Sequence, residues 1–397
     1  MAGLFAALLL RKVGWTVDVF ERSDVELSGR GAGIVTHAEL CSVLEAVGLD
    51  STKNLGVAVQ GRKTLDCTGR VIASYPWPQV NTSWDLVFRM LRGAFPADRY
   101  HLDKELASVE SREESVVAHF ADGGSVECDL LVGADGFRSI VRGQILPEVQ
   151  PHYAGYIAWR GLVDETAFSQ GARKLLFDCL AFCLPPNEQM LGYPVAGPDN
   201  DLRKGRRRYN FVWYRPANDV QLKSLLTDES GRAHPVSIPP TLVRAEAIET
   251  LRAEARTLLA PQLGEAVDLT PQPFLQPIYD VETPQMAFGR IALVGDAAFV
   301  GRPHVAAGVT KAAEDAMALA TSLQHTCDVP AALQSFESAR LPTNRRILQR
   351  GRDLGLYLQA ELRTEQERRR AAQHHSPQAV MSEIAILDFL HEQGATC

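Results

Sequence analysis

The stretch Asp129-Leu-Leu-Val-Gly-Ala-Asp-Gly136 is a short apolar run that ends in a carboxylate between glycines. The apolar residues predict a buried strand, and the glycines predict a sharp turn that leads into a helix near Ser139. A second stretch, Gly289-Arg-Ile-Ala-Leu-Val-Gly-Asp296, has the same character. A single turn of this kind is common in loops. Two of them predict an α/β domain whose strands end in glycine and acid.

The N-terminal residues supply a third combination of glycine and acid. Residues 3–13 predict a buried helix, and Thr16-Val-Asp-Val-Phe-Glu21 alternates as a strand does. Glu21 lies 18 residues after Gly3, close to the spacing of about 20 residues in a dinucleotide-binding βαβ unit. Gly3 takes the place of the last fingerprint glycine, but the first strand and the earlier glycines are missing. We therefore expect a Rossmann-like domain without its first strand, from a sequence cut short at its start.

Composition places the chain among ordinary globular enzymes. It has 397 residues, of which 46% are hydrophobic and 22% charged, with a formal net charge of −7. This charge argues against a nucleic-acid or anionic-membrane partner, and no apolar run approaches the roughly 18 residues of a membrane span. The seven cysteines form no CxxC pair and no zinc-ligand spacing, which favours reduced thiols and no metal site. We expect a cytoplasmic protein.

The middle of the chain changes character at about residue 151. Strand-like runs rich in Tyr, Trp and Phe predict a mainly antiparallel sheet, at residues 154–160, 173–177, 189–195 and 208–214. Helices are expected near 219–226 and 240–259, and again from 308–324 and 331–370. The predicted division is Rossmann-like segments at 1–62, 87–150 and 274–350, an inserted substrate domain at 63–86 and 151–273, and a helical tail at 351–397.

Together these motifs resemble those of a known family. Gly133-Ala-Asp-Gly136 with Ser139 and Arg142, and Gly295-Asp-Ala-Ala298, are similar to motifs of the class A flavoprotein monooxygenases. These are FAD-dependent aromatic hydroxylases of the para-hydroxybenzoate hydroxylase type. In that family the first motif serves both FAD and NAD(P)H, and the acid of the second contacts the ribityl chain of FAD.

The resemblance implies a set of cofactor-binding positions. Arg30 and Gly33 belong to the turn Gly29-Arg-Gly-Ala-Gly-Ile34, whose glycines suit a backbone that approaches a ligand closely, or else a flexible loop. The full set expected to bind FAD is Gly3, Glu21, Arg22, Arg30, Gly33, Arg89, Asp135, Gly136, Gly295, Asp296, Pro303 and Gly308.

Other segments are similar to the branch of the family that hydroxylates 2,6-dihydroxypyridines. They include Tyr153-Ala-Gly-Tyr156, Trp159-Arg-Gly161 and Arg302-Pro-His304, with Lys311 downstream. Phe299 stands where the wider family usually has histidine, and Val305 where it tends to have glycine. Both departures favour a pyridine ring over a simple phenol.

The resemblance implies a reaction. NADH or NADPH reduces FAD, O₂ adds to give a flavin hydroperoxide, and its distal oxygen passes to an electron-rich ring. We therefore predict a monooxygenase that hydroxylates a hydroxypyridine-type ring, and a homodimer by resemblance. Two alternatives stay open: a family member acting on a phenolic or polyketide substrate, and a degenerate flavoprotein that binds ligand without turnover.

The protein must also hold the ring and exclude water. The candidate substrate contacts are Tyr156, Trp159, Tyr193, Phe211 and Trp213, although any of these aromatic residues serves equally in a core. His304 is the candidate catalytic residue, because an ordinary histidine titrates near 6.5 and suits a general base. Its alternative is a structural hydrogen bond within the loop, and His152 is a weaker second candidate.

Overall fold

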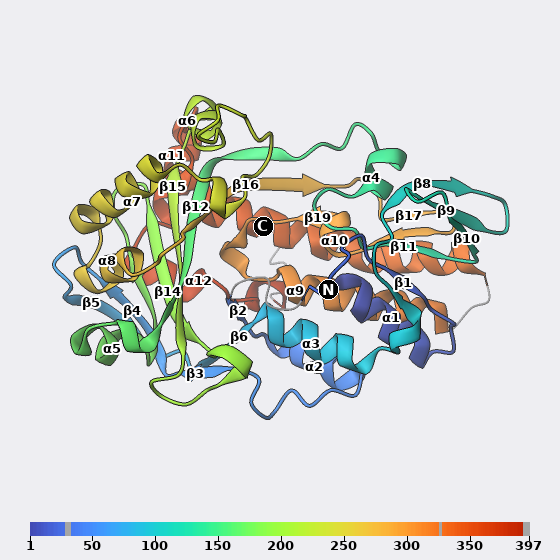
Figure 1. Ribbon diagram of the computed structural model, residues 1–397, viewed down its shortest axis with the longest axis horizontal. Helices are drawn as coiled ribbons and strands as arrows, with labels where there is room; N and C mark the ends of the chain where they lie inside the picture. The colour runs from blue at the N-terminus through green and yellow to red at the C-terminus, as the bar shows by residue number, and fades with distance from the viewer. Residues whose placement is uncertain (28–32, 325–327, 392–397) are drawn as a thin grey trace.

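The computed structural model describes residues 1–27, 33–324 and 328–391. The helices of this part of the chain are α1 (Ala2–Lys12), α2 (Ala38–Ala46), α3 (Trp84–Ala94), α4 (Ile140–Ile145), α5 (Gln170–Leu176), α6 (Asp219–Leu225), α7 (Ala245–Leu258), α8 (Pro261–Asp268), α9 (Gly308–Gln324), α10 (Val329–Leu354), α11 (Glu365–Gln373) and α12 (Pro377–Glu383). Figure 1 shows their arrangement.

The strands are mostly short. They are β1 (Val19–Phe20), β2 (Gly33–Val35), β3 (Val57–Val59), β4 (Gly61–Leu65), β5 (Val71–Tyr75), β6 (Gln79–Ser83), β7 (Tyr100–His101), β8 (Leu106–Ser111), β9 (Val116–Phe120), β10 (Ser125–Cys128), β11 (Leu131–Gly133), β12 (His152–Asp164), β13 (Cys179–Cys183), β14 (Gln189–Val195), β15 (Arg208–Pro216), β16 (Phe274–Glu282), β17 (Ala287–Phe288), β18 (Ile291–Leu293) and β19 (Phe299–Val300).

The first layer of the molecule surrounds α1. Parallel pairs join β1 to β7 and β11 to β18, in two separate small sheets, and β8, β9 and β10 form an antiparallel meander. Helix α1 consists almost wholly of buried apolar residues and packs against α9. The predicted helix, the meander and the strands before both glycine-acid turns are confirmed. This is the α/β, Rossmann-like part of the fold, and α9 and α10 cover it (Figure 1).

The second layer is a sheet of eight strands in the order β19-β16-β12-β15-β14-β13-β4-β5. Its neighbours pair antiparallel, apart from the parallel pair of β13 and β4. The mainly antiparallel inserted sheet is therefore confirmed. It includes β16, which begins after residue 273, and β4 and β5 from near residues 61–75.

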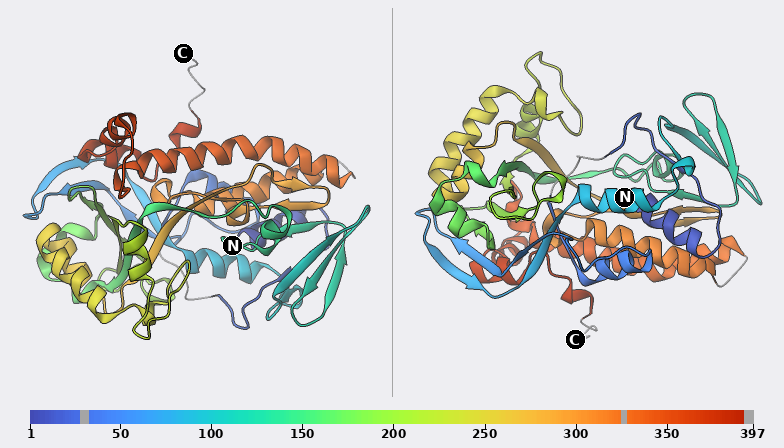
Figure 2. Two further views of the ribbon diagram at one scale, coloured as in Figure 1. Left: turned by 90° about the horizontal axis from the view of Figure 1, so that it is seen from above. Right: turned by 60° about the horizontal axis from the view of Figure 1, so that its bottom comes forward.

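Two cores flank this sheet. One face packs against α5, α7 and α8, through side chains such as Trp159, Phe211 and Trp213. The other face packs against the residues around His304, the end of α10 and the C-terminal helices, through Tyr156, Tyr193 and Tyr214. Figure 2 shows the C-terminal helices from two further sides. We call the second face the inner face of the sheet.

One predicted strand is wrong. Residues 173–176 belong to α5, which runs from Gln170 to Leu176, and Phe177 is its C-cap. The side chain of Ser169 accepts a hydrogen bond from the backbone N–H of Ala172 (3.3 Å) and begins the helix. Ala172 and Leu176, four residues apart, are both buried. The apolar run that suggested a strand is therefore the buried stripe of a short helix.

Candidate active site

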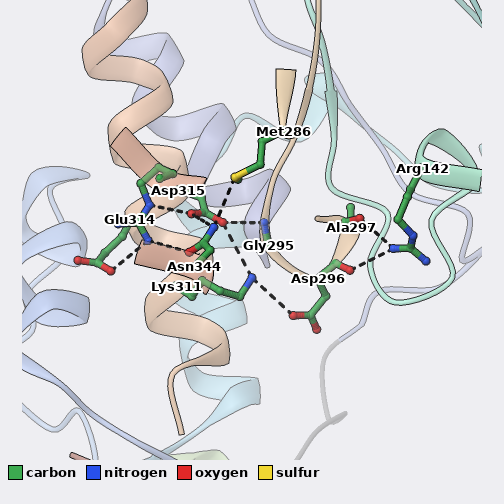
Figure 3. Close-up of polar contacts among 10 residues, drawn as sticks. Arg142, Met286, Gly295, Asp296, Ala297, Lys311, Glu314, Asp315 and Asn344 are labelled. Atoms are coloured by element: carbon green, nitrogen blue, oxygen red, sulfur yellow. Dashed lines mark hydrogen bonds and ion pairs between the residues drawn. The ribbon is translucent and has the colours of Figure 1, made fainter. Parts of the chain in front are cut away.

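Two turns that are distant in sequence meet at the N-terminal end of α1. Arg142, which is buried, donates from Nη1 to the carbonyl oxygen of Ala297 (2.8 Å) and from Nη2 to that of Phe137 (2.7 Å). A further contact from Nη1 reaches the carbonyl of Asp296 (3.5 Å). One guanidinium thus fixes the turn after β11 against the turn after β18 (Figure 3).

The junction requires glycine at position 295, because the backbone there has a positive φ and lies close to α1. Its φ is +60°, and a Cβ at this position would lie 2.8 Å from the Cβ of Ala2. Its N–H donates to Oδ2 of Asp315 (3.0 Å). A side chain at Gly295 would therefore push the turn away from α1. Gly3 is less constrained, since an added Cβ would meet Ala134 at an ordinary 3.4 Å.

Asp315 on α9 is the centre of a buried polar network below this turn. Its Oδ1 accepts hydrogen bonds from Nε of Arg340 (2.8 Å) and from Nδ2 of Asn344 (3.0 Å), both on α10. Nζ of Lys311 lies 3.9 Å from its Oδ2. The side chain of Asp315 is wholly buried, so these partners offset the cost of its charge. Figure 3 shows the network joining α9, α10 and the turn at Gly295.

Asp296 lies at the open side of the same turn. Its side chain is 53% exposed, and Nζ of Lys311 approaches its Oδ1 at 4.0 Å. The pKa of Asp296 is nevertheless raised, chiefly by desolvation from the surrounding protein atoms. A carboxylate with many protein neighbours and much free surface is recessed but accessible. It is suited to accepting hydrogen bonds from ligand hydroxyl groups.

Glu21 completes this region from the other side. It follows β1, and its Oε1 accepts a hydrogen bond from the N–H of Ser23 (3.0 Å). The terminal ammonium of Met1 experiences the charges of both Glu21 and Asp296, so both carboxylates lie near the start of α1. The two acids predicted to bind sugar hydroxyls of the cofactor are therefore brought together.

The remaining candidates for cofactor binding fall into two groups, those that lie in the turns of the site and those whose side chains have other partners. Gly136 has a φ of +77° in its turn, and Pro303 and Gly308 lie on either side of the short loop that leads into α9. Asp135 instead caps α4, since its Oδ2 accepts from the N–H groups of Ile140 (2.7 Å) and Val141 (3.2 Å). Arg89 is exposed and pairs with Asp85 (3.0 Å).

Arg22 is exposed as well, and Arg30 lies outside the described residues. Gly33 reaches the inner face of the sheet: its carbonyl accepts from the hydroxyl of Tyr193 (2.8 Å), and a Cβ there would lie 2.6 Å from that ring. The N–H of Gly33 donates to Oδ1 of Asn210 (3.4 Å). The end of the glycine-rich turn thus packs against the inserted sheet.

The five aromatic substrate candidates are separated by the alternation of the strands. Tyr156 and Tyr193 lie on the inner face. Trp159, Phe211 and Trp213 lie on the opposite face, buried against α5, α7 and α8. Because successive side chains of a strand point to opposite faces, the structure does not bring these three to the site, which corrects the expectation for them.

The same alternation identifies inner-face residues that the sequence analysis missed. Arg160 lies four residues after Tyr156 on β12, and Asn210 and Tyr214 lie on β15. The register places Tyr214 beside Ala158 and Asn210 beside Tyr193. A period of two counted from Tyr156 would have found Arg160.

His304 is buried and lies in the loop before α9, against the inner face of the sheet. Its Nε2 shares a hydrogen bond with the hydroxyl of Tyr156 (2.8 Å), and its ring lies 4.6 Å from that of Tyr214. Nδ1 has no partner among the described residues. Burial, aided by the charges of Arg302 and Arg160, lowers the pKa of His304 to about 3. The expected titration near 6.5 is therefore wrong, and the imidazole is neutral at working pH.

A family model described as an FAD binding domain matches residues 1–156 and 249–351, and a model described as FAD binding domain-like matches residues 153–280. The chain belongs to the FAD binding domain family, and within it to the class A flavin-dependent aromatic-ring monooxygenases. Its cofactor is FAD, with NAD(P)H as co-substrate.

Individual relatives agree with this assignment. The chain is 33% identical to the 2,6-dihydroxypyridine 3-monooxygenase of Paenarthrobacter nicotinovorans, over 90% of this chain and 89% of that protein. It is 27% identical to the 6-hydroxynicotinate 3-monooxygenase of Pseudomonas fluorescens, over 82% and 80%. The solved 2,6-dihydroxypyridine-3-hydroxylase of Arthrobacter nicotinovorans superimposes with a TM-score of 0.85 at 32% identity, over 92% of each chain. Klebsiella pneumoniae HpxO complexed with FAD and uric acid shares the fold, with a TM-score of 0.73 over 96% of this chain and 90% of that one.

The residues at the end of α1 fit FAD. Asp296 and Glu21, near the start of that helix, would offer carboxylate oxygens to the ribityl and ribose hydroxyls of a bound FAD. Nζ of Lys311 is buried without a hydrogen-bond partner among the described residues, and supplies positive charge beside Asp296.

Within the part of the chain that the structure describes, no group of three or more His, Cys, Asp or Glu residues is placed to hold a metal ion. None of the described helices is long and apolar enough to cross a membrane.

Proposed function

We propose that this protein hydroxylates a hydroxypyridine, or a closely similar hydroxylated N-heteroaromatic ring, with NAD(P)H and O₂. The observation that carries this proposal is the pairing of Tyr156 with His304 on the inner face, beside the loop that leads into α9. The similarity to a 2,6-dihydroxypyridine 3-monooxygenase over 90% of the chain supports it. When bound, FAD supplies the redox chemistry that activates O₂.

The residues of the chain hold and orient the ring. Tyr156 and Tyr214 offer aromatic surface and hydroxyl groups, and burial raises the pKa of both, Tyr214 to about 12. They therefore remain protonated hydrogen-bonding groups. His304, neutral and with Nδ1 unpartnered, is suited to one hydrogen bond with a ring hydroxyl or ring nitrogen. A pKa of about 3 makes it a weak proton acceptor, so we propose a positioning contact.

Packing supports exclusion of water from the reacting ring. The N–H of Ala385 donates to the carbonyl of His304 (2.8 Å), and Arg62 donates to the carbonyls of Met381 (2.9 Å) and Ile384 (2.6 Å). The C-terminal helices are therefore fixed over the inner face. Removal of water strengthens polar contacts and protects reactive species.

The test is anaerobic reduction of the purified flavoprotein by NADH or NADPH, with and without 2,6-dihydroxypyridine. We expect substrate to accelerate reduction, and aerobic turnover to yield one hydroxylated product per NAD(P)H consumed. NAD(P)H oxidation without product would contradict the proposed substrate. A colourless protein that gains no flavin absorption on addition of FAD would contradict turnover altogether.

A second candidate for the substrate is a phenolic acid. The relatives include a 3-amino-4-hydroxybenzoate 2-monooxygenase of Streptomyces cremeus, 31% identical over 89% of this chain and 84% of that protein. A panel that scores product from hydroxypyridines, hydroxybenzoates and polyketides separates these candidates.

We also propose a cytoplasmic location and a homodimer. Light scattering on the purified protein tests the homodimer.

A further inference from the structure

Arg160 lies near the middle of the inner face. Side chains at even positions of β12, including Ala154, Tyr156 and Ala158, belong to the core on this side of the sheet. Arg160 continues that row, and the register places it opposite Val212 of β15. Its charge acts on Tyr193, Tyr214 and His304. The guanidinium is therefore directed toward the proposed ring site.

Arg160 has no carboxylate partner, unlike several other arginines in or beside the sheet. It is half-buried, and its buried Nε makes no hydrogen bond within the described residues, while the guanidinium lies within hydrogen-bonding reach of the Tyr214 hydroxyl. Among those same residues, no carboxylate lies within ion-pair distance of it. By contrast, three arginines in or beside the sheet form ion pairs: Arg207 with Glu165 (2.8 Å), Arg215 with Glu188 (3.0 Å) and Arg302 with Asp280 (3.1 Å).

The groups around Arg160 do not neutralise it. Burial raises the pKa of Tyr156, Tyr193 and Tyr214, which keeps their hydroxyls protonated. Burial also lowers the pKa of His304, which keeps that ring neutral. A partly desolvated cation among neutral groups carries an uncompensated cost. An anionic ligand would remove this cost, whereas a neutral ligand of the same shape would not.

We propose that Arg160 binds the aromatic substrate as its anion, through a deprotonated ring hydroxyl. This inference rests on the proposed function and adds to it the residue that contacts the ring oxygen. The planar guanidinium presents several N–H donors in a fixed fork, which suits an oxyanion in the ring plane. Binding the anion also delivers the ring in its more electron-rich form, which favours attack on an electrophilic oxygen.

The experiment is calorimetric titration of the flavin-loaded protein with two probes of similar size. 2,6-Dihydroxypyridine can lose a proton from a ring hydroxyl, whereas 2,6-dimethoxypyridine cannot. We expect the wild type to bind the dihydroxy probe more tightly. Arg160→Met should weaken the binding of the dihydroxy probe about 10- to 100-fold, because a charge-assisted hydrogen bond is lost. The same change should weaken the binding of the dimethoxy probe by less than about threefold. The titration stoichiometry reports the folded fraction, so partial unfolding does not distort the ratio.

Two further variants complete the design. Arg160→Lys keeps the charge without the fork, and should fall between wild type and Arg160→Met. Arg215→Met is the matched control, because Arg215 lies on the same sheet but is paired with Glu188 and Glu254; it should leave the ratio of the two affinities unchanged.

Equal weakening of both probes in Arg160→Met, or no weakening, would overturn the inference. Tighter binding of 6-hydroxynicotinate than of 2,6-dihydroxypyridine, lost in Arg160→Met, would indicate a carboxylate at Arg160 and would also overturn the assignment to a ring oxygen. Failure of the proposed function is distinguishable. In that case the probes discriminate as expected, but no hydroxylated product forms.

Discussion

Arg142 donates a hydrogen bond of 2.8 Å to the carbonyl oxygen of Ala297, and so joins two turns that lie 155 residues apart in the chain. Each turn follows a strand of one small sheet, in which β11 pairs parallel with β18. The guanidinium holds the two turns in one arrangement beside the start of α1. The geometry of the cofactor region therefore depends on a residue whose own side chain is buried.

Replacement of Arg142 by Met should weaken this junction. The change leaves the carbonyls of Phe137 and Ala297 without a donor, and should lower the free energy of unfolding by about 2–3 kcal/mol. We expect a lower melting temperature and faster loss of FAD on dilution, measured by flavin fluorescence. Arg138→Met is the control, since Arg138 is exposed on the same turn and its side chain donates to the Ser237 hydroxyl (3.1 Å) and to neither turn carbonyl. Retention of FAD by Arg142→Met at the wild-type level would contradict this role.

Lys311 should contribute to cofactor affinity through its charge. It lies 4.0 Å from Asp296 and 3.9 Å from Asp315, so Lys311→Met leaves two carboxylates near each other without their shared cation. Because FAD is itself anionic, we expect its affinity to fall roughly tenfold. Equilibrium dialysis of the apoprotein with FAD measures this change, and Lys311→Arg should retain most of the affinity. Unchanged affinity in Lys311→Met would show that the charge acts only on folding.

Gly355 should be intolerant of a side chain. A Cβ at this position would lie 2.4 Å from the hydroxyl oxygen of Tyr156 and 2.8 Å from Nε2 of His304. Gly355→Ala should therefore displace the Tyr156–His304 hydrogen bond and reduce both thermal stability and binding of 2,6-dihydroxypyridine. Gly93→Ala is the control, because nothing lies within 4 Å of a Cβ there.

A double variant separates the two neighbours of Gly355. Tyr156→Phe removes the closer oxygen, so Gly355→Ala with Tyr156→Phe should lose less stability than the two single changes added together. Additive losses in the melting temperature would show that the added methyl group acts elsewhere.

The lowered pKa of His304 should make the free energy of unfolding depend on pH. Its folded pKa is about 3, below the ordinary 6.5. Between these values the unfolded chain binds a proton that the folded chain does not, so stability is full above pH 6.5 and falls as the pH is lowered toward 3. His37 and His375, whose pKa values are also lowered, act in the same direction. The test is therefore the difference between wild type and His304→Gln.

We expect the variant to lose less melting temperature than the wild type between about pH 7.5 and about pH 5. In the same range the pH profile of wild-type turnover should show no step from His304 near 6.5. A smaller acid sensitivity in the wild type than in His304→Gln would contradict a buried neutral imidazole.

Local patterns were sufficient to predict much of the fold. The glycine-acid turns after β11 and β18, the buried helix α1 and the strands β12, β14 and β15 all follow from short-range periodicity and turn residues, which require no partner to recognise. The errors came from short apolar runs. Residues 173–176 form a helix that begins at the cap of Ser169. Strand β13 was missed because a fully buried strand carries no alternation. Strand β16 was missed because it contains Pro277, a residue that argues against a strand.

By itself, the sequence determined the class of protein, because Gly295-Asp-Ala-Ala298 and the turn after β11 are local signals of cofactor contact. Only the tertiary structure decided which side chains share a site. Trp159 packs into the core between the sheet and the helices α5, α7 and α8, whereas Arg160 faces His304. The two side chains separate because successive residues of one strand point to opposite faces of the sheet. The tertiary structure also made His304 neutral, because a pKa depends on burial and surrounding charge, and both are properties of the folded chain.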